Sequence, residues 1–114
     1  IFHETFAHLQ QQHGQVNYVG STACAVVSWI DADNKLHITT ANLGDSSAYV
    51  VIVSDRGLEY YSRLNVLHKP TAFSERERID FLGGIVRFGR LGANLALSRA
   101  FSDKELDGKG ISYT

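Results

Sequence analysis

The middle of the chain contains four short segments rich in apolar, β-branched and aromatic residues. These segments are residues 22–30, 35–43, 48–54 and 58–64. Turn-forming residues separate them, in the groups Asp31–Asn34, Gly44–Ser47 and Asp55–Gly57. Because turns this short join neighbouring strands that run in opposite directions, the pattern predicts an antiparallel meander.

Helical periodicity appears on both sides of these strands. Residues 1–13 place Phe and Leu side chains at i, i+4 and i+7, which predicts a helix there. Residues 75–82 predict a second helix, with Ser74 and Glu77 as a capping box and Gly83–Gly84 as its end. Strands grouped in sequence, with helices set apart from them, indicate an α+β fold in which helices pack on an antiparallel sheet.

Composition narrows the class of protein. The 114 residues suit one domain, and a formal net charge of -1 gives no electrostatic signature of nucleic-acid binding. No apolar run approaches the roughly 20 residues that span a bilayer, and the first residues do not form a signal peptide. We therefore expect neither nucleic acid nor membrane as a partner. Cys24 is the only cysteine, which favours a reducing, cytoplasmic location.

Two carboxylates are candidates for metal binding. Asp45 follows Gly44 directly after an apolar strand, and Asp103 follows the apolar stretch 95–101. Strand ends beside glycine suit metal ligands, and Mg²⁺ and Mn²⁺ prefer oxygen donors. An Asp at such a position is also a common turn cap, so spacing alone leaves both interpretations open. The five histidines show no metal-binding spacing.

Other notable side chains have simple structural interpretations. We expect Arg99 to pair with a carboxylate or a carbonyl, and His68 to anchor the connection into the second helix. The large apolar side chains that we assign to the core are Trp29, Phe81, Phe88 and Phe101.

Several motifs occur in an order that is typical of one known family. They are GSTAC (20–24), ANLGDSSAYV (41–50), HKP (68–70), E-x-x-R-I with GG (75–84) and LALSRAFSDKEL (95–106). Taken together, they resemble the central segment of the metal-dependent serine/threonine protein phosphatases, the type 2C or PPM family. The resemblance covers about residues 20–112.

The resemblance implies an antiparallel β-sandwich with flanking helices. It also implies Mg²⁺ or Mn²⁺ cofactors, two or more in the complete domain, and hydrolysis of phosphoserine and phosphothreonine by a metal-activated water. Asp103 matches an Asp of the family's metal centre, and Asp45 matches an Asp linked to an additional, weaker metal site. No side chain of this chain matches a catalytic residue other than these metal ligands.

The sequence departs from the family pattern at several places near these motifs. Where the family usually has Arg, Gly, Asp and Gly, this chain has Ser47, Ser102, Leu67 and Ala93 respectively. None of the changes removes a metal carboxylate. Ser102 directly precedes Asp103 and lacks the backbone freedom of glycine.

The family's early acidic and D-G-H motifs do not occur in residues 1–19, and its late D-G and D-N motifs are expected after the position of Thr114. We therefore expect residues 1–114 to form a single partial domain, about half of a domain near 250 residues. A fragment, a reduced relative and one half of a split domain remain open explanations.

We expect this chain alone to be inactive, and the full-length protein to be a phosphatase acting on phosphoproteins. We also expect self-association or pairing with the missing half. The alternative is a non-catalytic, pseudophosphatase-like interaction domain.

Overall fold

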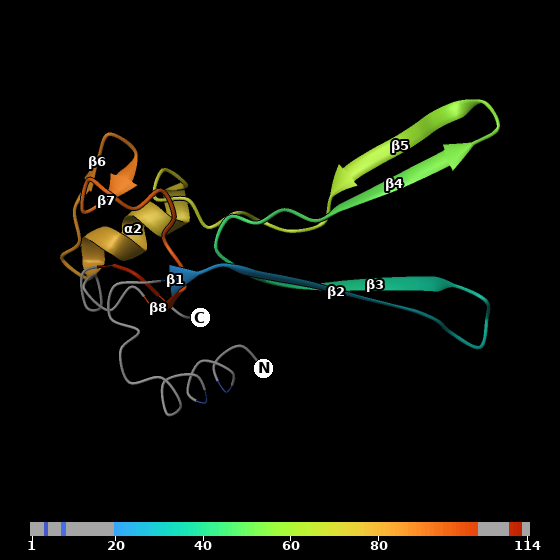
Figure 1. The fold of residues 1–114 in the computed structure, drawn as a ribbon, viewed down its shortest axis with the longest axis horizontal. Coiled ribbons are helices and arrows are strands. Elements are labelled where there is room, and N and C mark those ends of the chain that lie inside the picture. Colours follow the sequence, from blue (N-terminus) through green and yellow to red (C-terminus); the bar gives the residue numbers. More distant parts are fainter. Residues whose placement is uncertain (1–3, 5–7, 9–19, 103–109, 113–114) are drawn as a thin grey trace.

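The computed structural model describes residues 4, 8, 20–102 and 110–112. The strands are β1 (Gly20–Ser21), β2 (Ala23–Ile30), β3 (Leu36–Leu43), β4 (Tyr49–Ser54), β5 (Gly57–Arg63), β6 (Val86–Arg87), β7 (Arg90–Leu91) and β8 (Phe101–Ser102), and the helix is α2 (Phe73–Phe81). Figure 1 shows two long hairpins that extend from a smaller part containing α2 and the short strands. The helix expected over residues 1–13 lies almost entirely outside the described residues.

The first hairpin confirms two predicted strands and the turn between them. Strands β2 and β3 pair antiparallel along their whole length, from Ala23 opposite Leu43 to Ile30 opposite Leu36. At the turn, one carboxylate oxygen of Asp31 accepts hydrogen bonds from the backbone N–H groups of Asp33 (3.0 Å) and Lys35 (2.9 Å). This arrangement is the local side-chain turn for which Asp is favoured.

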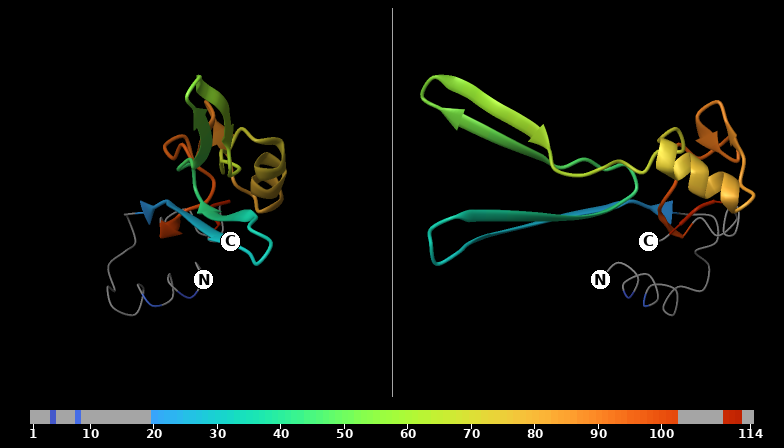
Figure 2. Two further views of the ribbon diagram at one scale, coloured as in Figure 1. Left: turned by 90° about the vertical axis from the view of Figure 1, so that its right-hand side faces the viewer. Right: turned by 180° about the vertical axis from the view of Figure 1, so that it is seen from behind.

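The second hairpin, β4–β5, also forms as predicted. The predicted continuous meander is wrong, because it is interrupted between β3 and β4. Strands β4 and β5 pair antiparallel with a bulge at Ile52–Val53, whereas β3 and β4 are not hydrogen-bonded to each other. The intervening segment 44–48 bonds instead to residues 64–68, through His68 N–H to the Gly44 carbonyl (3.0 Å) and Leu64 N–H to the Ala48 carbonyl (2.8 Å). The two hairpins consequently diverge, as both views in Figure 2 show.

Helix α2 ends as predicted but begins differently. Gly83 has a φ of 73°, its N–H bonds to the Asp80 carbonyl (3.0 Å), and the Gly84 N–H bonds to the Ile79 carbonyl (2.9 Å). These two bonds form a Schellman motif, in which glycine accepts the left-handed conformation without strain. The predicted capping box is wrong, because the N-cap is Ala72 and Ser74 lies inside the first turn.

Two small buried clusters form the core of the described residues. The larger cluster, beside α2, contains Ile79, Leu91, Ala100 and Ile111, with Val86, Leu95 and Leu97 packed against it. The second contains Leu43 and Phe101, with Ala23 packed against it. Phe101 is therefore a core residue as predicted. Phe81 (90% exposed), Phe88 (98%) and Trp29 (49%) are not, so their assignment to the core is wrong for this chain.

The hairpins leave most of their apolar side chains in contact with solvent. Within the described part of the chain, no residue of β2, β4 or β5 is buried. Their exposed large apolar residues include Val27, Trp29, Ile30, Val51, Val53 and Tyr61. Antiparallel strands with flanking structure thus form a partial α+β domain, as expected. Where the structure is described, no helix is long and apolar enough to cross a bilayer.

We expect Gly44→Ala to destabilise the folded protein more than Gly57→Ala. Both glycines have positive φ angles, 98° and 106°, which cost an L-residue roughly 1–2 kcal/mol. A Cβ at Gly44 would also lie 2.3 Å from Cγ2 of Thr22, whereas a Cβ at Gly57 would meet nothing within 4 Å. Overpacking should add about 1–3 kcal/mol at Gly44 alone.

Urea denaturation of both variants measures this difference in free energy of unfolding. The double variant Gly44→Ala/Thr22→Ser removes the clashing methyl group and should recover part of the loss. Equal losses at the two glycines would show that close packing at the end of β3 is unimportant.

Candidate active site

Of the two predicted metal ligands, the structure describes only Asp45. It lies two residues beyond the end of β3, in the segment that connects the two hairpins. Asp103 lies outside the described residues, directly after β8, which ends at Ser102. Its position relative to Asp45 therefore stays a prediction.

The Asp45 carboxylate forms an ion pair with the Lys69 ammonium group. The Asp45 side chain is 27% exposed and that of Lys69 39%, so solvent reaches both charges. Nowhere in the described ranges do three His, Cys, Asp or Glu side chains gather as a metal site requires. As an oxygen donor, Asp45 fits a hard cation as one ligand, but the remaining ligands would have to come from elsewhere.

Apolar packing brings the end of β3 next to β8. Leu43, the last residue of β3, is in the same buried cluster as Phe101, the first residue of β8. Strand β8 also pairs antiparallel with β1, with Ser102 opposite Gly20. The two segments that lead to Asp45 and Asp103 therefore contact each other, although they are more than 50 residues apart in sequence.

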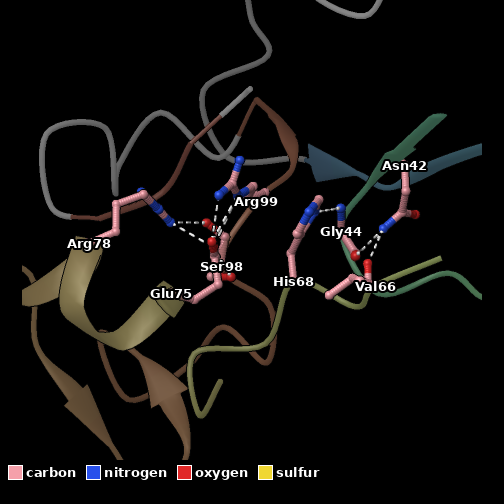
Figure 3. Close-up of polar contacts among 8 residues, drawn as sticks. All are labelled: Asn42, Gly44, Val66, His68, Glu75, Arg78, Ser98 and Arg99. Atoms are coloured by element: carbon pink, nitrogen blue, oxygen red, sulfur yellow. Dashed lines mark hydrogen bonds and ion pairs between the residues drawn. The ribbon is translucent and has the colours of Figure 1, made fainter. Parts of the chain in front are cut away.

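His68 holds the Gly44–Asp45 turn through two hydrogen bonds to the backbone of Gly44, and Figure 3 shows the one made by its ring. Its Nδ1 accepts from the Gly44 N–H (3.0 Å), and its own N–H donates to the Gly44 carbonyl (3.0 Å). The His68 carbonyl in turn accepts from the Ser98 N–H (2.9 Å). The expectation that His68 anchors the connection into α2 is confirmed, and this residue also ties the turn to the segment before β8.

The environment of His68 favours its neutral form. Burial lowers the pKa of the imidazole, and the positive charge of Arg99 lowers it further, against an opposing effect of Glu75. A neutral ring suits the geometry, because Nδ1 must keep a lone pair to accept the Gly44 N–H. The proton of the neutral ring is therefore on Nε2.

Glu75 is a buried carboxylate in the first turn of α2, only 4% exposed. It accepts hydrogen bonds from the Ser98 hydroxyl (2.6 Å), from Arg99 Nη2 (2.6 Å) and from Arg78 Nη2 (3.0 Å), as Figure 3 shows. Burial acts to raise the carboxyl pKa, but these hydrogen bonds outweigh it and lower the pKa to about 2. Arg99 thus pairs with a carboxylate, as expected.

Sequence reasoning missed the importance of Glu75. In the sequence it belongs to the charged run ERER, which looks like the solvated face of a helix. Two signals were available: Glu75 is the first residue of the E-x-x-R-I motif, and Arg99 and Ser98, at the end of an apolar run, would need a polar partner when buried. Nothing in the spacing of 23 residues identifies that partner.

We expect the stability of the protein to fall as the pH drops below about 6.5, in part because of His68. Its pKa is lowered in the folded state, so the unfolded chain takes up a proton at a pH where the folded chain does not. The stabilisation is present above the ordinary histidine pKa and is lost as the pH falls through the lowered value.

Urea denaturation at pH 7.5, 6.5 and 5.5 measures this dependence. His68→Asn is the matched variant, because its side-chain oxygen can accept the Gly44 N–H but cannot titrate. The variant should lose less stability than the parent between pH 7.5 and 5.5. Parallel pH profiles would rule out this role of His68.

Comparison with known proteins assigns the fold to a family. A profile of the protein phosphatase 2C family matches residues 2–113. The chain is 43% identical to protein phosphatase 2C homolog 2 of Hypocrea jecorina over 86 residues, which are 75% of this chain and 17% of that protein. It is 34% identical to protein phosphatase 2C homolog 4 of Saccharomyces cerevisiae over 116 residues, or 99% of this chain and 27% of that protein.

A solved structure supports the same assignment at the level of the fold. The serine-threonine phosphatase 2C of Toxoplasma gondii superposes with a TM-score of 0.73 at 24% identity, covering 99% of this chain and 41% of that one. The chain thus spans 17%, 27% and 41% of the lengths of these three relatives. On the match across residues 2–113, this chain belongs to the protein phosphatase 2C family.

Proposed function

We propose that the complete protein containing this segment is a metal-dependent protein serine/threonine phosphatase. Family membership supports the reaction class, hydrolysis of phosphoserine and phosphothreonine in phosphoproteins. The observation that carries the proposal is the packing of Leu43 against Phe101, because it joins the segment bearing Asp45 to the strand that precedes Asp103. A cytoplasmic location is proposed from the free thiol of Cys24, the only cysteine.

The family is metal-dependent, and we propose Mg²⁺ or Mn²⁺ as the cofactor, with Asp103 and Asp45 among the ligands. The chemistry that such ions supply is activation of a water and neutralisation of charge on the phosphoryl group. This chain's part is to hold its carboxylates in place: Gly44, fixed by His68, sets the backbone before Asp45. The other ligands belong to parts of the domain beyond the described residues.

We expect Asp103→Asn in the complete protein to lower phosphatase turnover by at least about a hundredfold, or roughly 2.7 kcal/mol of transition-state stabilisation. The amide keeps the size of the side chain and one oxygen but removes the charge that holds a divalent ion. Asp45→Asn should lower turnover less, because Asp45 is proposed to serve a weaker site.

The assay uses a phosphothreonine peptide with Mn²⁺, and melting temperatures check that the variants fold. Asp33→Asn, in the exposed turn between β2 and β3, is the matched control and should behave like the parent. Normal turnover of Asp103→Asn would show that Asp103 is a structural cap. A complete protein without any turnover would favour the non-catalytic interaction domain.

We expect residues 1–114 alone to self-associate or to pair with the rest of the domain. The hairpins expose large apolar side chains on β2, β4 and β5, and unpaired strand edges recruit other chains. Light scattering of the isolated segment measures its mass in solution, and adding the remainder of the domain should replace self-association by a one-to-one complex. A stable monomer in dilute solution would contradict this expectation.

A further inference from the structure

The Glu75 carboxylate bonds to three side chains, and two of them lie outside α2. Its carboxylate contacts both Ser98 and Arg99, the residues that lead into β8 at Phe101. Arg78 donates to Glu75 and also to the Ser98 carbonyl (3.0 Å). The backbone at Ser98 and Arg99 is thereby fixed to the first turn of α2.

Ser98 extends this connection to the other candidate ligand segment. Its hydroxyl donates to Glu75, while its N–H donates to the His68 carbonyl. His68 then binds both backbone groups of Gly44, the residue before Asp45. A continuous series of hydrogen bonds thus runs from Glu75 through Ser98 and His68 to Gly44, the residue before Asp45. Figure 3 labels Glu75, Ser98, His68 and Gly44.

Close backbone packing reinforces this series. A Cβ on Gly44 would lie 3.1 Å from the Arg99 carbonyl oxygen, so the turn lies directly against the segment that Glu75 holds. A shift of the Arg99 backbone would therefore displace Gly44, because a tightly packed interior transmits displacements.

The charge of Glu75 is needed to hold this arrangement. Two guanidinium groups, those of Arg78 and Arg99, share the single carboxylate. Within the described residues, Nε and Nη1 of Arg78 are buried without a hydrogen-bond partner, so the cluster has more donors than acceptors. Removing the negative charge would leave both cations without their common partner.

We propose that Glu75 is a positioning residue that fixes the spacing between the Gly44–Asp45 turn and the segment Ser98–Ser102, which precedes Asp103 in the sequence. This inference rests on the proposed phosphatase function. Among the described residues, the Glu75 carboxylate bonds to Ser98, Arg99 and Arg78 and not to Asp45, so it acts on the Asp45 turn through Ser98, Arg99 and His68. Loss of an outer partner that orients metal ligands typically weakens metal affinity about 10- to 100-fold.

The test compares Glu75→Gln with Asp80→Asn in the complete protein. Asp80 lies on the same helix but is exposed and pairs with Arg76, so its variant controls for loss of a carboxylate from α2. Glu75→Gln should raise the Mn²⁺ concentration for half-maximal turnover at least about tenfold. Its KM for the phosphothreonine peptide should stay within about threefold, and Asp80→Asn should change neither quantity.

A second readout does not depend on activity. In protein labelled with ¹⁵N-histidine, the His68 ring signals, assigned by their loss in His68→Asn, report whether Nδ1 still accepts the Gly44 N–H. Glu75→Gln should shift these signals, whereas Asp80→Asn should not. Ser98→Ala removes the hydroxyl bond to Glu75 with little change in volume, and it should shift them in the same direction if Glu75→Gln fails to fold.

The outcomes separate this inference from the proposed function. A parent protein without turnover refutes the phosphatase, while the His68 signals still test the connection from Glu75 to Gly44. A parent with turnover, together with a folded Glu75→Gln or Ser98→Ala whose Mn²⁺ requirement or His68 signals match the parent, overturns the positioning role. A merely structural role would lower the folded fraction without changing the Mn²⁺ requirement.

Discussion

The compact part of this segment depends on the burial of one carboxylate among two guanidinium groups and a hydroxyl. A carboxylate as buried as Glu75 is unfavourable by several kcal/mol unless it is paired and fully hydrogen-bonded. Arg99, Arg78 and Ser98 supply those bonds, and in doing so they dock α2 on the segment before β8. Because these contacts join elements distant in sequence, the helix, the connection at His68 and the Gly44 turn form as one unit.

The hairpins follow from a different constraint. Each consists of only two strands, and two-stranded ribbons are marginally stable in water without a covered apolar face. The β2–β3 hairpin joins the compact part at its base, where Leu43 packs against Phe101 and Ala23, and the base of the β4–β5 hairpin is held by the hydrogen bond from the Leu64 N–H to the Ala48 carbonyl. The apolar side chains farther along β2, β4 and β5 are typical of a sheet face that packs against other layers, and this chain covers only 41% of a solved relative. The described residues thus contain a hydrogen-bonded site region and two hairpins whose apolar side chains are exposed.

The sequence predicted those features that local chemistry determines. Alternating β-branched segments placed β2 to β5 correctly, the Asp31 turn formed as expected, and Gly83–Gly84 ended α2. Long-range features were not predictable, since no local pattern encodes that segment 44–48 bonds to 64–68, or that Glu75 meets Ser98. Trp29, Phe81 and Phe88 were assigned to the core from apolarity alone, which cannot distinguish a core from a surface that another part of a domain covers. Within the candidate site, the resemblance identified Asp45 from the sequence. Only the structure shows its ion pair with Lys69 and the hydrogen bonds by which His68 holds Gly44.

The ion pair between Asp45 and Lys69 bears on how the proposed site binds a cation. Both side chains are partly exposed, and ion pairs of this kind contribute only about 0–1 kcal/mol to stability. A divalent cation with further ligands can therefore displace the ammonium group at little energetic cost, so Lys69 is no obstacle to metal binding. Lys69 also gives Asp45 a partner when no ion is bound, and this limits repulsion between Asp45 and any other carboxylate brought to the site. The Asp45 carboxylate is thus paired with a partner that a cation at the proposed site would replace, whereas two hydrogen bonds from His68 hold the backbone of the preceding residue, Gly44.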